Sequence, residues 1–212
     1  MSQDLYPNYA ALKEARKEGT DYKITVLSEG RSTDFIAIAP HGGKIESCTS
    51  EIAREVASDL CCLYLFEGTM RNANGTLHIT STNFDEPRAL EVVQNCQTAI
   101  AIHGRRDKGD METIYLGGLD QQLVKILATC LNEANFKTQI GGHKFPAVDQ
   151  ANICNRCATG GGVQLELPKT LRDSLLIDHR ARGELVLAIR GALNSHIQLN
   201  SDLRASASKI SV

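Results

Sequence analysis

The sequence predicts an α/β fold, a single domain with an open mixed sheet flanked by helices. Short apolar runs of strand length alternate along the chain with segments whose apolar residues recur at helical spacing. Several of these runs are apolar throughout, which is typical of strands buried on both faces of a sheet. The chain has 212 residues, 42% apolar and 23% charged, enough for one core and too apolar for disorder. We expect one domain over residues 1–212, with a lead-in over 1–20 and a tail over 200–212.

The first elements follow a polar lead-in that is partly helical from Tyr9 to Lys17. Residues 22–27 and 35–39 are β-branched or apolar runs of strand length, and a Gly-Arg-Ser turn separates them. Residues 50–60 repeat apolar side chains at spacings of three and four, which predicts an amphipathic helix.

The middle of the chain continues the alternation. Residues 60–66 return to strand, and residues 77–81 form a second short strand after an Asn-Ala-Asn-Gly turn signal. Asp85-Glu86-Pro87 begins a helix, because acidic residues and proline favour the first turn. Further strands are predicted over residues 98–103 and 113–116.

The last third begins with Asp120, which can cap a helix with one apolar face. A loop rich in Gly, Asn and Cys follows over 140–162, and 163–167 is a strand. Pro168 starts a short helix, and a final helix is expected over roughly 181–195.

Composition excludes several classes of protein. The net charge of −2 gives no general attraction to nucleic acid or membranes, and no stretch approaches the ~18 apolar residues that span a bilayer. Residues 1–16 lack the apolar region of a signal peptide. The seven cysteines, two of them adjacent at Cys61 and Cys62, fit reduced thiols better than a disulfide framework. We therefore expect synthesis in the cytoplasm without a signal peptide.

Two strand ends carry histidines. His41-Gly-Gly-Lys-Ile-Glu46 follows one apolar run, and His103-Gly104 ends another. Two histidines and a glutamate are a ligand set of catalytic zinc with one open coordination position. The flexible glycine pair lets the chain reverse between His41 and Glu46. The alternative is that the histidines are polar caps and that Gly-Gly is only a turn.

Glu166 is an acidic residue inside the apolar strand 163–167. Burying a carboxylate without a partner costs several kcal/mol or forces it to take up a proton. Beside a metal-bound water, such a carboxylate would act as a general base in hydrolysis. The alternative is a sheet with one solvated face, on which Glu166 points to water.

Four motifs together resemble the phage-type poly-γ-glutamate hydrolase family, which is similar in fold to zinc carboxypeptidases. The motifs cover most of the chain between residues 20 and 195 and fall in the family's order. They are Ala39-Pro-His-Gly-Gly-Lys-Ile-Glu46, Ala101-Ile-His-Gly104, Asn155-Arg156 and Gly162-Val-Gln-Leu-Glu-Leu167.

The resemblance implies one zinc ion with His41, Glu46 and His103 as its ligands, and Glu166 as the general base that activates the metal-bound water. It also implies cleavage of the γ-linked amide between glutamates. Two features depart from the wider carboxypeptidase pattern. The spacing from His41 to Glu46 is longer, and the Asn-Arg pair at residue 155 follows the last histidine ligand instead of preceding it.

An anionic polymer with a carboxylate on every unit needs cationic partners near the metal. Arg156 fits, because a guanidinium can hold a carboxylate through two hydrogen bonds, and Asn155 could assist through its amide. Arg105 begins a local basic patch directly after His103. Arg54, Arg71 and Arg172 are weaker candidates.

Other readings remain open. A zinc amidohydrolase or deacylase for small N-acyl glutamates uses the same residues, and a non-catalytic binder of anionic polymer would use only the basic patch. Cys154-Asn-Arg-Cys157 is interpreted as two ordinary cysteines, and His78 and His143 are not assigned to the site. We expect a monomer. The resemblance further implies an enzyme made in an infected cell and released at lysis to degrade a capsule.

Overall fold

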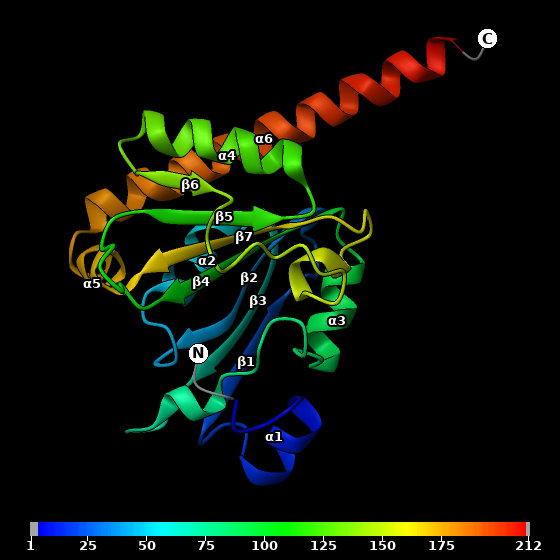
Figure 1. Cartoon of the computed structure of the whole chain (residues 1–212). Helices are drawn as coiled ribbons and strands as arrows, with labels where there is room; N and C mark the ends of the chain where they lie inside the picture. Colours follow the sequence, from blue (N-terminus) through cyan, green and yellow to red (C-terminus); the bar gives the residue numbers. More distant parts are fainter. Residues whose placement is uncertain (1–3, 211–212) are drawn as a thin grey trace.

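The computed structural model describes residues 4–210 and has a seven-stranded sheet with helices on both faces (Figure 1). The strands are β1 (Tyr22–Leu27), β2 (Ser32–Gly43), β3 (Cys61–Gly68), β4 (Thr98–Arg105), β5 (Ile114–Gly118), β6 (Thr138–Ile140) and β7 (Val163–Pro168). The helices are α1 (Tyr9–Ala15), α2 (Thr49–Ala57), α3 (Pro87–Gln94), α4 (Gln121–Glu133), α5 (Lys169–Ile177) and α6 (His179–Ile210), with short 3₁₀ helices η1 (Asn74–Leu77) and η2 (Ile153–Arg156).

The sheet is mixed, as the sequence predicts. Its strand order is β1-β3-β2-β4-β7-β5-β6. The four central strands β3, β2, β4 and β7 are parallel, whereas β1 and β5 run antiparallel to their central neighbours. The carboxyl ends of β2, β4 and β7 therefore meet at one edge of the sheet, where open α/β sheets bind ligands.

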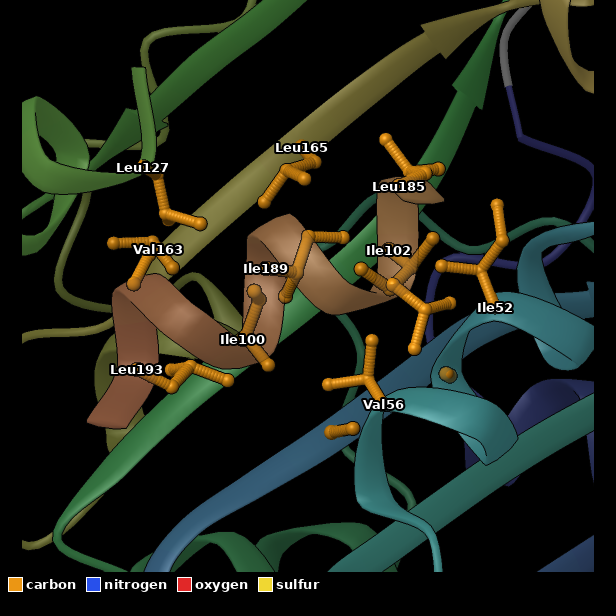
Figure 2. Packing of buried hydrophobic residues seen from close by; sticks show 14 of the residues in the cluster. Ile52, Val56, Ile100, Ile102, Leu127, Val163, Leu165, Leu185, Ile189 and Leu193 are labelled. Atoms are coloured by element: carbon orange, nitrogen blue, oxygen red, sulfur yellow. The ribbon is translucent and has the colours of Figure 1, made fainter. Parts of the chain in front are cut away.

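Each face of the sheet is covered by its own apolar core. On one face α2, α4 and α6 pack on the central strands, as Figure 2 shows for Ile52 of α2, Leu127 of α4 and Ile189 of α6 around Ile100 and Leu165. The other face is covered by α1, α3 and the loops near η1 and η2. The strands are consequently buried on both sides, which explains their continuous apolar sequence.

Two helix starts follow the predicted chemistry. Asp120 caps α4, and its Oδ1 accepts a hydrogen bond from the backbone N–H of Leu123 at 2.9 Å. Glu86 caps α3 in the same way toward Ala89 at 2.9 Å, with Pro87 as the first helical residue.

Two sequence predictions are wrong in detail. Residues 78–81 do not form a strand. Leu77 and Ile79 are apolar because they pack on the face of the sheet, not because they join its ladder. The 140–162 loop includes η2 and follows a short strand, β6. Within the described residues, no helix has both the length and the apolar character needed to cross a membrane.

The final helix is much longer than predicted. α6 continues to Ile210, so most of the expected tail is helical, and its end projects beyond the sheet in Figure 1. No proline or glycine follows Gly191 to end the helix. Residues 1–3 of the expected lead-in and 211–212 of the expected tail lie outside the described residues.

Candidate metal centre

His41 lies in the last three residues of β2, not in a loop after the strand. The pairing of β2 with β3 shifts register between Ala39 and Gly42, which is a β-bulge. Bulges re-aim side chains beside functional sites. This bulge places the His41 ring beside that of His103 on the neighbouring strand β4, with ring centroids 4.9 Å apart.

Directly after His41 the chain reverses. Gly43 has a φ of +62°, and a Cβ atom there would lie 2.7 Å from the carbonyl oxygen of Gly68, so only glycine fits. The backbone N–H of Glu46 then donates to the carbonyl of His41 at 2.9 Å. The reversal predicted from the glycine pair therefore brings Glu46 back to the histidine.

Three donor atoms converge at this point. The Nδ1 atoms of His41 and His103 are 3.1 Å apart. Glu46 Oε2 lies 3.5 Å from His41 Nδ1 and 3.9 Å from His103 Nδ1. Both histidines are buried, at 1% and 2% exposure. The three residues chosen from the sequence thus form one cluster.

Neighbouring groups fix the orientation of the three donors. His41 Nε2 donates to the carbonyl oxygen of Ile79 at 2.7 Å, which leaves a lone pair on Nδ1 in the neutral ring. His103 Nε2 lies 3.4 Å from Ser81 Oγ. The N–H of Gly104 donates to Glu46 Oε2 at 2.7 Å. Hydrogen bonds of this kind, behind the ligand atoms, are typical of metal sites.

The cluster fits a zinc ion. Ligands at 2.0–2.1 Å in a tetrahedron are about 3.4 Å apart, and the three observed separations lie on either side of that value. Imidazole nitrogens and a carboxylate oxygen are also the donor types that zinc takes in catalytic sites. Two imidazole nitrogens that face a carboxylate are stabilised when a cation or a shared proton lies between the nitrogens and the carboxylate.

The electrostatics of the cluster favour positive charge at its centre. Burial opposes ionisation of Glu46, but His41 outweighs it and lowers the pKa of Glu46 to about 2. Burial would lower the pKa of His41, yet the Glu46 carboxylate raises it above its ordinary value. Burial and the nearby His41 lower the pKa of His103 to about 3, so its ring is a neutral donor. A charged carboxylate and a neutral imidazole are the protonation states that bind metal.

Glu166 lies beside the cluster. It pairs with His103 in the β4–β7 register and is 6% exposed. Burial first, and then the charge of Glu46, raises its pKa well above the ordinary range. Gln164 Nε2 donates to Glu166 Oε1 at 2.8 Å, and Gln164 Oε1 accepts from Asn152 Nδ2 at 3.1 Å. The solvent-facing alternative for Glu166 is therefore wrong.

His78 is a neighbour that sequence reasoning did not select. Its ring lies against that of His41, with centroids 4.0 Å apart at 30°. His78 Nδ1 is 2.7 Å from Asp4 Oδ1. One donor atom each of His41, Glu46 and His78 also lie within 4.8 Å of one another. We take His103 as the third member of the cluster because its Nδ1 lies 3.1 Å from His41 Nδ1 and 3.9 Å from Glu46 Oε2. A turn histidine without spacing to a partner gives no signal in the sequence.

The predicted substrate residues lie away from the cluster or are already occupied. Asn155 makes hydrogen bonds with the backbone of Leu119 and Gly162 through Oδ1, and with Ala147 and Asp149 through Nδ2. Gly162 is four residues before Glu166, about 13 Å along the strand.

Arg156 and Arg105 also bind protein groups. Arg156 Nε donates to the Ala151 carbonyl at 2.9 Å. Arg105 is buried over the Tyr115 ring, and its two terminal nitrogens bind backbone carbonyls and the Asp110 carboxylate. Nothing in the structure tests their contact with substrate, so these roles stay predictions.

The remaining sequence motif is inert in this structure. Cys154 and Cys157 are free, buried thiols. Burial raises the pKa of Cys154, with the nearby Cys157 adding to the effect. Thiols of this kind are unreactive at neutral pH.

A buried His-His-Glu cluster with an adjacent carboxylate, at the carboxyl edge of a mixed α/β sheet, is an arrangement typical of metal-dependent hydrolases. Comparison with known proteins identifies the family. A sequence profile described as poly-gamma-glutamate hydrolase matches residues 6–186, and the chain belongs to this family.

Relatives support the assignment. The UPF0714 proteins YmaC and YndL of Bacillus subtilis (strain 168) are 34% and 36% identical, and each alignment covers 82% of this chain. The alignments cover 73% and 68% of those proteins. The structure of a bacteriophage poly-gamma-glutamate hydrolase superposes with a TM-score of 0.88 at 32% identity, over 93% of this chain and 100% of that one. Zinc-free apo YndL superposes with a TM-score of 0.82 at 33% identity, over 91% and 98%.

Family membership makes the chain a hydrolase of amide bonds, so the non-catalytic alternative is wrong. The fold class is confirmed by the same structures. The resemblance stated from four short motifs is confirmed as well.

Proposed function

We propose that the protein is a zinc-dependent hydrolase that cleaves the γ-glutamyl amide bonds of poly-γ-glutamate. The observation that carries this proposal is the convergence of His41 Nδ1, His103 Nδ1 and Glu46 Oε2 beside the buried Glu166. Family membership supports the polymer as substrate, and the existence of a zinc-free form of YndL supports zinc as the ion.

His41, Glu46 and His103 would hold one zinc ion. When bound there, zinc polarises a carbonyl and lowers the pKa of a water molecule. Glu166 takes a proton from the attacking water and passes it to the leaving amine. A raised pKa suits both halves of this task, because general acid–base groups work best near the operating pH.

The residues around Glu166 have defined tasks in this mechanism. Gln164 fixes one carboxyl oxygen of Glu166, so the other oxygen remains available for the proton transfer. The positive charges of Arg105 and Arg172 lower the free-energy cost of ionising the Glu166 carboxyl group. The Arg172 guanidinium lies against Gly104, and a Cβ atom added to Gly104 would come within 2.5 Å of it.

Metal analysis together with a polymer sizing assay tests the proposal. The protein should bind one zinc ion, shorten poly-γ-glutamate, stop doing so after chelation and recover when zinc is restored. A His103→Ala protein should lose both zinc and activity, while His179→Gln, an exposed histidine at the start of α6, should keep both. Full activity in metal-free protein would refute the metal role. Cleavage of N-formylglutamate but not polymer would favour the small-molecule amidohydrolase.

A further inference from the structure

The Asp4–His78 pair lies next to the metal centre and has no task in the mechanism above. His78 follows η1 in a loop, and its side chain is 35% exposed. Asp4 precedes the residues that the family profile matches, which begin at residue 6. The two residues are 74 positions apart in sequence and 2.7 Å apart in space.

We propose that His78, oriented by Asp4, is a fourth protein donor of this metal centre, an inference that rests on the proposed function. Both Asp4 oxygens are engaged. Oδ1 accepts from His78 Nδ1, and Oδ2 accepts from the backbone N–H of Thr80 at 2.6 Å. The carboxylate can only accept, so the proton lies on Nδ1 and the lone pair lies on Nε2. A carboxylate behind a histidine whose other nitrogen is free is the arrangement found behind metal-ligating histidines.

The free Nε2 atom of His78 is suited to bind a metal ion and not the substrate. Among residues 4–210 no hydrogen-bond partner engages His78 Nε2. The polymer carries carboxylates, which need hydrogen-bond donors and positive charge. His78 offers a lone pair backed by the negative charge of Asp4, and this repels a carboxylate while attracting a cation.

Ring geometry gives His78 a different standing from the three primary donors. Those donors lie 3.1–3.9 Å apart, and one donor atom of His78 lies within 4.8 Å of donor atoms of His41 and Glu46. The His78 ring lies against the His41 ring, with centroids 4.0 Å apart at 30°, so His78 must turn before both rings can direct a nitrogen to one ion. A loop residue that is one-third exposed can make that movement, whereas His103, fixed in the central sheet, cannot. His78 is therefore the adjustable donor, able to fill the open position and to leave it for substrate.

Zinc affinity tests this inference without any activity assay. Competition with a chromophoric chelator would be measured for the parent protein and for His78→Gln, Asp4→Asn and His179→Gln. Loss of an outer partner costs about 10–100-fold in metal affinity, so Asp4→Asn should weaken zinc binding by that factor and His78→Gln by at least as much. His179→Gln should bind zinc as the parent does. The visible spectrum of the cobalt(II)-loaded protein should change in His78→Gln, because the number of nitrogen donors changes.

Two further comparisons separate the possible failures. If His78→Gln leaves zinc affinity and the cobalt spectrum unchanged while His103→Ala abolishes binding, the fourth-donor inference is overturned and the metal centre stands. If His103→Ala also leaves affinity unchanged, the proposed function itself fails. Thermal unfolding of each metal-free variant checks that it is folded. Should His78→Gln not fold, Asp4→Asn decides, because asparagine retains an acceptor for His78 Nδ1, and parent-like zinc affinity there overturns the inference.

Discussion

Replacing Glu166 by glutamine should change activity and stability in opposite directions. Glutamine keeps the shape of the side chain and an oxygen that can accept from Gln164, so only the charge is lost. General acid–base catalysis contributes about 10²–10⁴-fold, so turnover should fall by that factor, or about 3–5 kcal/mol of barrier. Zinc content should be unchanged, because Glu166 is not among the converging donors.

The stability of the metal-free Glu166→Gln protein should rise. Burial and Glu46 raise the pKa of Glu166, so the folded state disfavours its charged form. An acid whose pKa rises on folding costs stability at pH values above its unfolded pKa, about 4.3, and costs nothing when both states are protonated. The gain should therefore appear at neutral pH and vanish below about pH 4. Each 1 kcal/mol corresponds to about 2–4 °C in Tm for a domain of this size.

Three measurements check this prediction: a polymer sizing assay, zinc analysis, and Tm across pH 3–8. Glu184→Gln, at an exposed carboxylate of α6, is the matched control and should change none of them. Parent-level cleavage by Glu166→Gln would refute the general-base role. A lower Tm at neutral pH would refute the argument that burial penalises this charge.

Two further substitutions test the packing and the ion pairs of the fold. Gly162→Ala would place a Cβ 2.0 Å from the carbonyl oxygen of Cys154 and should lower Tm strongly, while Gly161→Ala meets nothing closer than 3.4 Å and should be nearly neutral in the same melts. Asp120 pairs with buried His196 at 2.9 Å, and against the effect of burial its hydrogen bonds lower the pKa of Asp120. Asp120→Asn keeps the helix cap but should cost about 1–3 kcal/mol in urea unfolding at pH 7. That difference should shrink as the pH falls below about 4, because protonation then removes the same charge, and a constant difference down to pH 3 would contradict this.

Local chemistry predicted most elements of the fold. The caps at Glu86 and Asp120 and the continuous apolar strands have causes within a few residues of themselves, and these predictions hold. The strand predicted over residues 77–81 is wrong because an apolar alternation indicates burial but not what the side chains are buried against. The predicted end of the final helix is wrong because nothing in its sequence marks a stop, and the Ser- and Ala-rich composition after Asn200 indicated a frayed end.

In the candidate site, too, the sequence predicted the features with a local cause and missed those that only the folded chain brings together. His41 and His103 could be chosen from the sequence because each lies near the end of a strand, and the parallel order of β2 and β4 brings such ends together. Glu46 could be chosen because it follows His41 across the glycine pair. The task of Asn155 could not be foreseen, since its hydrogen bonds to the backbone of Leu119, Ala147, Asp149 and Gly162 depend on how the loops fold around it. The pairing of His78 with a residue 74 positions away is likewise set only by the folded chain.

The three converging donors are held by backbone hydrogen bonds and by strands with an apolar core on each face, so the fold itself positions the donor atoms. If the site binds zinc as proposed, we expect folding and metal capture to be separate events, unlike in small zinc domains that fold only around their ion. On the proposed function, a cell short of zinc would accumulate folded but inactive protein, and later exposure to zinc would activate that store without new synthesis.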